Sequence, residues 1–266
     1  MPASFSMHAP KFSVSVEETI ATIAIDNPTK HNAVDLGMWQ ALPSIVAALD
    51  GDPDVRVVVL RGAGGKVFTS GADIAEFETV RRNAHEGRLY EAANEAAFWA
   101  VARCSKPVIA MIRGFCLGGG FGLALSCDLR IAADNAMFGI PAARLGVGYP
   151  PGAMRLVTAV VGAAAAKDLF FTARRIGAAE AQALGVLQRV VADQDLEAET
   201  RTLAQGIARN APLTIRAAKA AIDSAVGLGH AGANPAALAD LCFDSADAAE
   251  GRKAFLEKRS PVFTGR

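Results

Sequence analysis

The chain has 266 residues, and its charge is balanced, with Lys plus Arg and Asp plus Glu equal at 27 each. This balance gives no electrostatic reason to expect binding to nucleic acid or to an anionic membrane. A chain of this length buries roughly three quarters of its unfolded surface, so one large domain, with or without an extension, needs no metal or disulfide for stability.

The first residues and the cysteines bear on the cellular compartment. Residues 1–11 have too short an apolar run for a signal peptide and lack the arginines of a transit peptide, so we expect a disordered start. No apolar run approaches the roughly 20 residues of a transmembrane helix. The cysteines show neither metal-ligand spacing nor a C-x-x-C pair, which is typical of small buried residues in a reducing compartment. These features predict a cytoplasmic protein with no metal site.

The N-terminal part of the chain predicts strands and helices in alternation. Strands are expected over 12–16, 19–25 and 56–61, the first two as a hairpin, and helices over 35–50 and 88–103. The apolar residues of the second helix, which predict its buried face, are Leu89, Ala92, Ala96, Trp99 and Val101. Residues 76–87, before this helix, are polar and predict a mobile segment.

The stretch from Pro107 to Ala133 contains a strand, a glycine turn and a helix. Residues 108–112 form an apolar, β-branched run that predicts a buried strand, and residues 121–127 predict a short buried helix. Three glycines, 118–120, lie between them, and glycine is free to turn with positive φ. The start of the helix would present unpaired N–H groups and a positive partial charge to whatever lies over the glycines.

Two interpretations of these glycines compete. One is a tight turn that lets a helix pack on a sheet, and the other is a turn whose N–H groups face a negative or developing negative charge. A P-loop is disfavoured because no Gly-Lys-Ser/Thr follows, and the dinucleotide pattern G-x-G-x-x-G fails at Leu123. A second such turn, at Gly71, could supply another N–H group to the same oxygen.

The rest of the chain continues the alternation and then becomes helical. Strands are expected over 129–132, 137–140 and 186–191, a rigid loop over 146–152, and helices over 153–172, 177–184, 196–210, 213–226, 235–248 and 250–258. Strands that alternate with helices indicate an α/β fold with much parallel pairing.

Five motifs, in order along the chain, resemble the crotonase superfamily, which is the enoyl-CoA hydratase/isomerase family. They are TIAIDNPTKHNAV at 22–34, FTSGADI at 68–74, KPVIAMIRGFCLGGG at 106–120, CDLRIAADNAMFGIP at 127–141 and EGRKAFLEKRSPVF at 250–263. The resemblance implies a crotonase-like spiral of ββα units over 12–195. It also implies a helical C-terminal region over 196–266 that covers the active site and builds homotrimers or dimers of trimers.

The resemblance also implies a substrate and a site. The substrate would be an acyl-CoA thioester, with coenzyme A as part of the substrate and no other cofactor. Its carbonyl oxygen would accept hydrogen bonds from two backbone N–H groups, by position those of Ala72 and Gly119. Lys258 would approach the coenzyme A phosphates, either those bound to its own subunit or those bound to a neighbouring one. The expected substrate-contact residues are Lys30, His31, Ala33, Ser70, Gly71, Asp73, Ile74, Gly118, Gly122, Ala142 and Lys258. Asp73 is also expected to cap the helix that begins at Ile74.

The sequence departs from the family pattern at two positions. Hydratases of the family use two glutamates, and at the matching places this chain has Gly122 and Ala142. Hydration needs a base to take a proton from water and an acid to give one to the α-carbon, each worth about 10²–10⁴-fold. Isomerisation also needs a group that moves the proton. We therefore expect inefficient hydration, unless a bound anion or a side chain from elsewhere, for which Gly122 leaves room, replaces the missing carboxylate.

Decarboxylation of a malonyl-type thioester fits this site better, because loss of CO₂ forms the enolate without a base. A proton donor is then needed, and Tyr149 in the loop GVGYPPG is the candidate. Here the chain resembles a methylmalonyl-CoA decarboxylase branch of the family, although Ala72 replaces its histidine. The competing role of Tyr149 is packing on Pro150 and Pro151.

Two other functions remain as alternatives to decarboxylation. One is a hydratase or isomerase with a substitute acid/base, and the other is a non-catalytic acyl-CoA-binding protein.

Overall fold

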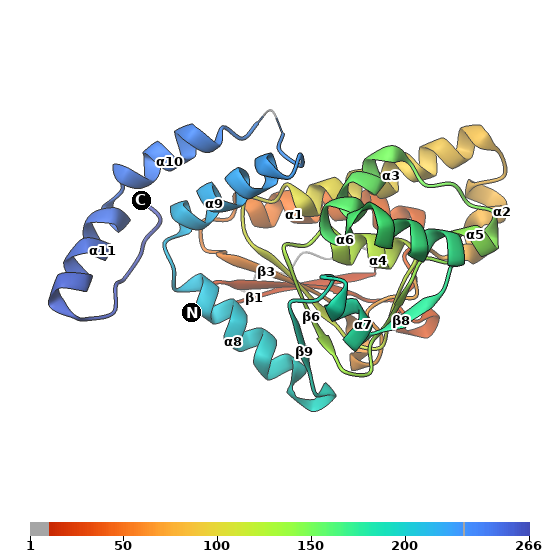
Figure 1. Cartoon of the computed structure of the whole chain (residues 1–266), viewed down its shortest axis with the longest axis horizontal. Helices are drawn as coiled ribbons and strands as arrows, with labels where there is room; N and C mark the ends of the chain where they lie inside the picture. The colour runs from red at the N-terminus through yellow and green to blue at the C-terminus, as the bar shows by residue number, and fades with distance from the viewer. Residues whose placement is uncertain (1–10, 231) are drawn as a thin grey trace.

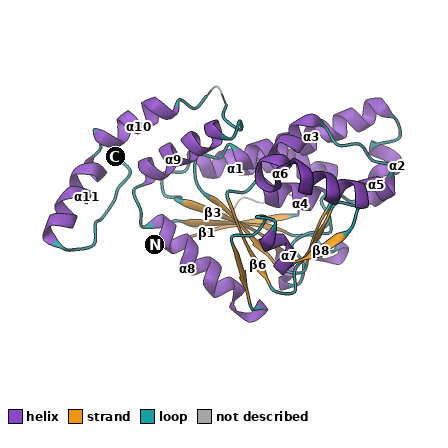
Figure 2. Cartoon of the chain, in the orientation of Figure 1, coloured by secondary structure: helices purple, strands orange, loops and turns teal. Residues whose placement is uncertain are grey.

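The computed structural model describes residues 11–230 and 232–266, so the expectation of a disordered start over residues 1–11 falls almost wholly outside the described residues. Two sheets and a set of helices make up the fold, with strand order β1-β2-β3-β4-β6-β9 in the larger sheet and β5-β7-β8 in the smaller one (Figures 1 and 2). The α/β class predicted from the alternation of strands and helices is confirmed.

The strands are short and follow the apolar runs of the sequence. They are β1 (Phe12–Glu17), β2 (Ile20–Ile25), β3 (Val57–Gly62), β4 (Val108–Ile112), β5 (Phe115–Leu117), β6 (Leu129–Ala133), β7 (Met137–Gly139), β8 (Arg175–Gly177) and β9 (Arg189–Val191). The predicted hairpin is confirmed, since β1 pairs antiparallel with β2. From β2 to β9 the larger sheet is parallel. Parallel strands are covered on both faces, which explains why every residue of β4 is buried.

The helices are more numerous than the sequence predicts. They are α1 (Leu36–Gly51), α2 (Phe77–Val80), α3 (Ala84–Ala102), α4 (Gly119–Leu125), α5 (Ala142–Leu145), α6 (Pro151–Thr172), α7 (Ala178–Ala183), α8 (Leu196–Ala208), α9 (Pro212–Ala225), α10 (Pro235–Phe243) and α11 (Ala246–Glu257). Single turns of 3-10 helix cover Pro28–Lys30, Ala63–Gly65, Ile74–Glu76 and Asp193–Asp195.

Two helical layers enclose the larger sheet. The principal core joins the sheet to α1, α3 and α4 through side chains such as Trp39, Phe98 and Leu123. A second cluster joins the other face of the sheet to α8, for example through Ile109 and Leu196. Helix α8 is therefore part of the sheet's covering, whereas α10 and α11 extend away from it as an arm (Figure 1). The division of the chain at residue 195 stays a prediction.

Several element boundaries differ from those expected, for local reasons. The predicted helix over 88–103 begins instead at Ala84, because Asn83 caps it by accepting from the amides of His85 and Glu86. The polar segment before it contains α2. The boundary between the helices expected over 235–248 and 250–258 lies earlier in the chain than predicted, because the Ser245 side chain caps α11 at its start. Strands β5 and β8 and helix α5 are too short to give a periodic signal.

None of the helices in the described part of the chain is long and apolar enough to cross a membrane.

Candidate active site

The site forms where two chain segments are held side by side. Residues 68–71 run parallel to β5, because the amide of Phe68 donates to the carbonyl of Arg113 at 2.7 Å and that of Thr69 donates to Phe115 at 3.0 Å. The amide of Leu117 donates back to Thr69 at 3.2 Å. These bonds bring the turn after β3 against the turn after β5.

Gly71 is a point of close contact between the two turns. Its φ is +101°, and a Cβ atom placed on it would lie 2.7 Å from the carbonyl oxygen of Leu117 and 3.6 Å from the Cα of Gly118. Both facts require glycine, since other residues rarely adopt this conformation and no side chain has room. The next residue, Ala72, is thereby held beside the glycine turn that starts α4.

The glycine turn itself packs closely against the side chain of Thr69. A Cβ atom on Gly120 would lie 2.1 Å from the Cγ2 atom of Thr69, so no side chain fits there. Helix α4 begins at Gly119, two residues earlier than the apolar run predicts, and all seven of its residues are buried. The predicted turn for close packing is therefore present.

A small cavity of about 60 Å³ opens over the two turns. It is lined by Ser70, Gly71, Ala72, Ile74, Phe77, Arg81, Tyr90, Glu91, Asn94, Gly118, Gly119, Pro141, Ala142, Leu145, Val147 and Tyr149. Among the described residues, no acceptor is in hydrogen-bond contact with the amide of Ala72 or of Gly119. Two residues that line the cavity therefore carry backbone donors without an acceptor in the described part of the chain.

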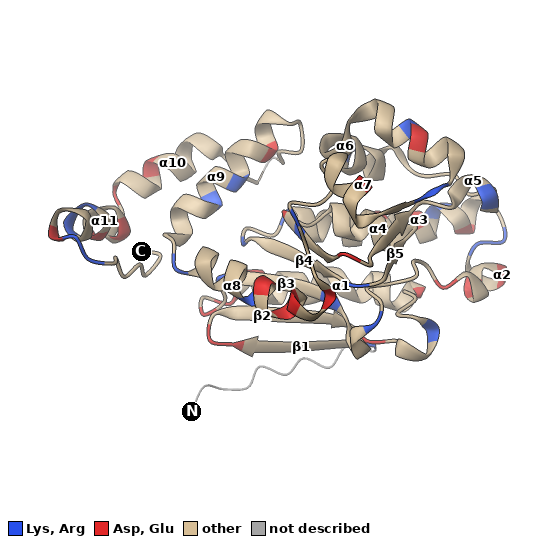
Figure 3. Ribbon diagram, turned by 60° about the horizontal axis from the view of Figure 1, so that its bottom comes forward, with Lys and Arg blue, Asp and Glu red and all other residues tan. Residues whose placement is uncertain are grey.

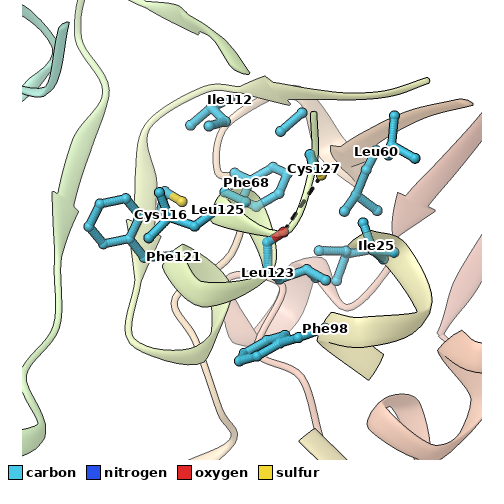
Figure 4. Packing of buried hydrophobic residues seen from close by; sticks show 14 of the residues in the cluster. Ile25, Leu60, Phe68, Phe98, Ile112, Cys116, Phe121, Leu123, Leu125 and Cys127 are labelled. Atoms are coloured by element: carbon cyan, nitrogen blue, oxygen red, sulfur yellow. Dashed lines mark hydrogen bonds between the residues drawn. The ribbon is translucent and has the colours of Figure 1, made fainter. Parts of the chain in front are cut away.

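Gly122 lies outside the cavity lining, because α3 occupies the space beside it. A Cβ atom on Gly122 would lie 2.7 and 2.8 Å from ring atoms of Phe98, whose side chain is 1% exposed. Figure 4 shows Phe98 packed beside Leu123 at α4. The expectation that Gly122 leaves room for a carboxylate is wrong, since an aromatic ring fills that room.

Glu91 is a cavity residue that the sequence analysis missed. It lies on α3, lines the cavity and forms an ion pair with Arg81, both side chains being less than one-fifth exposed. The guanidinium of Arg81 stacks over the rings of Phe77 and Tyr90, at 4.9 and 5.3 Å from their centroids. Burial raises the pKa of the Glu91 carboxyl, and the charge of Arg81 opposes this shift. The expectation of a site without a carboxylate is wrong.

The error arose from the predicted buried face of α3. Leu89 is 61% exposed, and Ala92 and Ala96 are also exposed. The buried residues of the helix are Tyr90, Asn94, Ala97, Phe98 and Val101. Alanines dominate this helix, so its apolar pattern is weak, and the sequence signal available was the spacing of Tyr90, Asn94 and Phe98 at four-residue intervals.

Two further polar groups face the cavity. Asn94 is 5% exposed, and Tyr149 is half-buried with its ring edge-on to Phe170 at 5.1 Å. Neither side chain has a hydrogen-bond partner within residues 11–230 and 232–266. Burial also raises the pKa of the Tyr149 phenol, so this group stays protonated and can donate a hydrogen bond.

The structure brings together about half of the residues expected to contact substrate. Those that line the cavity are Ser70, Gly71, Ala72, Ile74, Gly118, Gly119, Ala142 and Tyr149. Asp73 lies outside it, where it caps the helical turn at Ile74 as expected and pairs with Lys30 at 2.6 Å. His31 and buried Ala33 also lie outside it, and the carbonyl of His31 accepts from the amide of Ser70 at 3.0 Å.

Lys258 lies far from this cavity in its own chain. It ends α11, in the arm opposite the end of the molecule that carries α2 and α5 (Figures 1 and 3). A contact between Lys258 and a ligand in the cavity therefore requires a second copy of the chain.

Known proteins share this fold and sequence over nearly their whole lengths. A family model described as "Enoyl-CoA hydratase/isomerase" matches residues 15–266. A protein named crotonyl-CoA hydratase from Syntrophomonas wolfei is 36% identical over 93% of this chain and 95% of its own. A short-chain-enoyl-CoA hydratase from Clostridium acetobutylicum is 35% identical, over 91% of this chain and 93% of its own. The crystal structure of an enoyl-CoA hydratase/carnithine racemase from Magnetospirillum magneticum matches with a TM-score of 0.91 and 37% identity over 97% of both chains.

Proposed function

Because the chain belongs to the enoyl-CoA hydratase/isomerase family and has the crotonase fold, we propose that it binds an acyl-CoA thioester and stabilises its enolate. The N–H groups of Ala72 and Gly119 donate to the thioester oxygen. The observation that carries this proposal is that Ala72 and Gly119 line one cavity and that neither amide has an acceptor among the described residues. Each such donor is worth about 10²–10³-fold in kcat.

The reaction that the site favours is addition of water to a short-chain 2-enoyl-CoA. Relatives at 36% and 35% identity are named crotonyl-CoA hydratase and short-chain-enoyl-CoA hydratase. The cavity of about 60 Å³ is much smaller than an ordinary small-molecule pocket, which favours a small acyl group. Glu91 supplies the cavity with a titratable carboxyl, so the main reason to prefer decarboxylation is removed.

Decarboxylation of a malonyl-type thioester is the second candidate. It is favoured by the phenol of Tyr149, which lines the cavity and has no partner in the described part of the chain. A phenol in that place is suited to protonate an enolate that has formed by loss of CO₂.

A substrate panel separates these reactions. We expect hydration of crotonyl-CoA, measured by loss of the enoyl absorbance, and a fall in kcat/KM as the acyl chain lengthens. Release of CO₂ from malonyl-type thioesters that Tyr149→Phe abolishes would instead support decarboxylation. Tight binding of acyl-CoA esters without turnover on any member would show a non-catalytic binding protein and contradict the enzymatic proposal.

The arm formed by α10 and α11 is proposed to pack against other copies of the chain, as a homotrimer or a dimer of trimers. Large apolar side chains on the arm are not covered by the described part of the chain, with Phe255 84% and Leu256 81% exposed. Helix α10 carries one charged residue, Asp240 (Figure 3). Exposed apolar groups gathered on one region mark an interaction surface.

Replacing Phe255 and Leu256 together with serine is expected to shift the protein to a smaller species. Light scattering coupled to gel filtration measures this directly. The matched control is Phe171→Ser, because Phe171 is 76% exposed but lies on α6, outside the arm. An unchanged mass for the double variant would contradict the proposed interface.

A further inference from the structure

We propose that Glu91 is the acid/base of this site, that it moves a proton from the attacking water to the substrate α-carbon, and that Arg81 positions it. This inference rests on the proposed function, and it assigns the step that the absent side chains at Gly122 and Ala142 leave open. The observation behind this inference is that Glu91, on α3, lines the same cavity as Ala72 and Gly119.

The position of Glu91 on its helix places it one turn from a residue that packs on the glycine turn. Asn94 follows Glu91 by three residues, so their side chains share one face of α3 with Cβ atoms roughly 5–6 Å apart. A Cβ atom built on Gly119 would lie 3.4 Å from the Nδ2 atom of Asn94. Asn94 therefore packs against the glycine turn, and Glu91 lies one helical turn away from that contact.

Glu91 has no competitor within the cavity. Of the residues that line it in the described part of the chain, Glu91 is the one with a carboxyl group, and Arg81 is the one cation. Asn94 offers an amide without a partner next to it, a group able to hold a water molecule by a second hydrogen bond. A general base needs hydrogen-bond reach to the water it activates, and Glu91 and Asn94 line the same small cavity as Ala72 and Gly119.

One carboxyl group is sufficient for both proton transfers of the hydration. The Glu91 carboxylate takes a proton from water while the water oxygen forms a bond to the β-carbon. The π electrons of the double bond move to the thioester oxygen as an enolate, which the amides of Ala72 and Gly119 stabilise. The enolate then takes the proton from the Glu91 carboxylic acid at the α-carbon, which regenerates the carboxylate. Because one group handles both steps, hydroxyl and hydrogen add to the same face of the double bond.

Arg81 acts through Glu91 rather than on the substrate. Its guanidinium lies over the rings of Phe77 and Tyr90, which contact each other edge-on, and it pairs with the carboxylate. The ionisable groups that face Glu91 are Arg81, Glu95 on the same helix, and the phenols of Tyr90 and Tyr149. Burial and Glu95 raise the Glu91 pKa, whereas Arg81 lowers it. The base must be ionised, so kcat/KM rises with pH through this raised pKa.

The test compares three variants in hydration of crotonyl-CoA. Glu91→Gln is expected to lower kcat by about 10²–10⁴-fold, with unchanged affinity for the unreactive butyryl-CoA. Glu91→Asp keeps a titratable group and is expected to retain more activity. The matched control is Glu78→Gln, since Glu78 is exposed on the neighbouring helix α2 and should leave kcat unchanged.

Arg81→Gln gives a readout that a purely structural role would not produce. Loss of the cation is expected to move the rise of kcat/KM to higher pH, and Arg81→Lys is expected to restore it in part. Product formed in D₂O should carry deuterium at the α-carbon on the same face as the hydroxyl.

The outcomes separate this inference from the proposed function. Wild-type hydration with an equal kcat in Glu91→Gln would overturn the role of Glu91 and leave the proposed function standing. Addition to opposite faces would also overturn it, because one carboxyl cannot then serve both steps. If Glu91→Gln does not fold, the pH profiles of the wild type and of Arg81→Gln decide, and an unshifted profile counts against the inference. A wild-type protein without turnover on any acyl-CoA would reject the proposed function itself.

Discussion

Replacing Gly71 with alanine is expected to lower the free energy of unfolding by about 2–5 kcal/mol and to remove most turnover. Its φ of +101° is costly for a residue with a Cβ atom, by about 1–2 kcal/mol. The new Cβ would also lie 2.7 Å from the carbonyl oxygen of Leu117, and such overpacking costs about 1–3 kcal/mol. Chemical denaturation monitored by fluorescence measures the loss.

The effect on turnover follows from the place of Gly71 between the two turns. The clash with Leu117 must push the segment that carries Ala72 away from the one that carries Gly119. Misplacing one of the two donors is expected to lower kcat by about 10²–10³-fold, measured under conditions in which the variant is folded.

Gly146→Ala is the matched control for stability. Gly146 also has a positive φ, +64°, but no atom lies within 4 Å of a Cβ built there. It should lose only the conformational part, about 1–2 kcal/mol. Equal losses in the two variants would contradict a close contact between Gly71 and Leu117.

Replacing Gly122 with glutamate is expected to destabilise the protein by about 3 kcal/mol or more and to add no hydratase activity. The side chain would meet the ring of Phe98 within 3 Å at its first atom, and it would place an ionisable group in an apolar core. The free energy of unfolding and the rate of crotonyl-CoA hydration are the two measurements.

A double-mutant cycle tests the physical cause. Phe98→Ala alone is expected to cost about 3–5 kcal/mol, because it leaves a cavity against α4. Combined with Gly122→Glu it should cost less than the sum of the two changes, by about 1 kcal/mol or more, since the cavity accommodates the new side chain. Additive losses would show that Phe98 does not occupy the space beside Gly122.

Helix α3 shows why the candidate site could be only partly anticipated. Its sequence gives the helix but a weak apolar pattern, and the face expected from Leu89 is exposed, at 61%. The face that is buried follows from what the helix packs against, namely α1 and α4, and no pattern within the helix contains this information. Glu91 enters the cavity as a consequence of that packing.

The sequence by itself determined the α/β class, the hairpin of β1 and β2, strands β3 and β4, and the cap at Asp73. These features are local, because side-chain periodicity, turn residues and caps act over a few neighbouring positions. Tertiary structure alone decided that Phe98 fills the space beside Gly122, that Gly71 touches Leu117, and that Glu91 lies in the cavity. These contacts join segments far apart in the chain, and their geometry is set by close packing of the whole core.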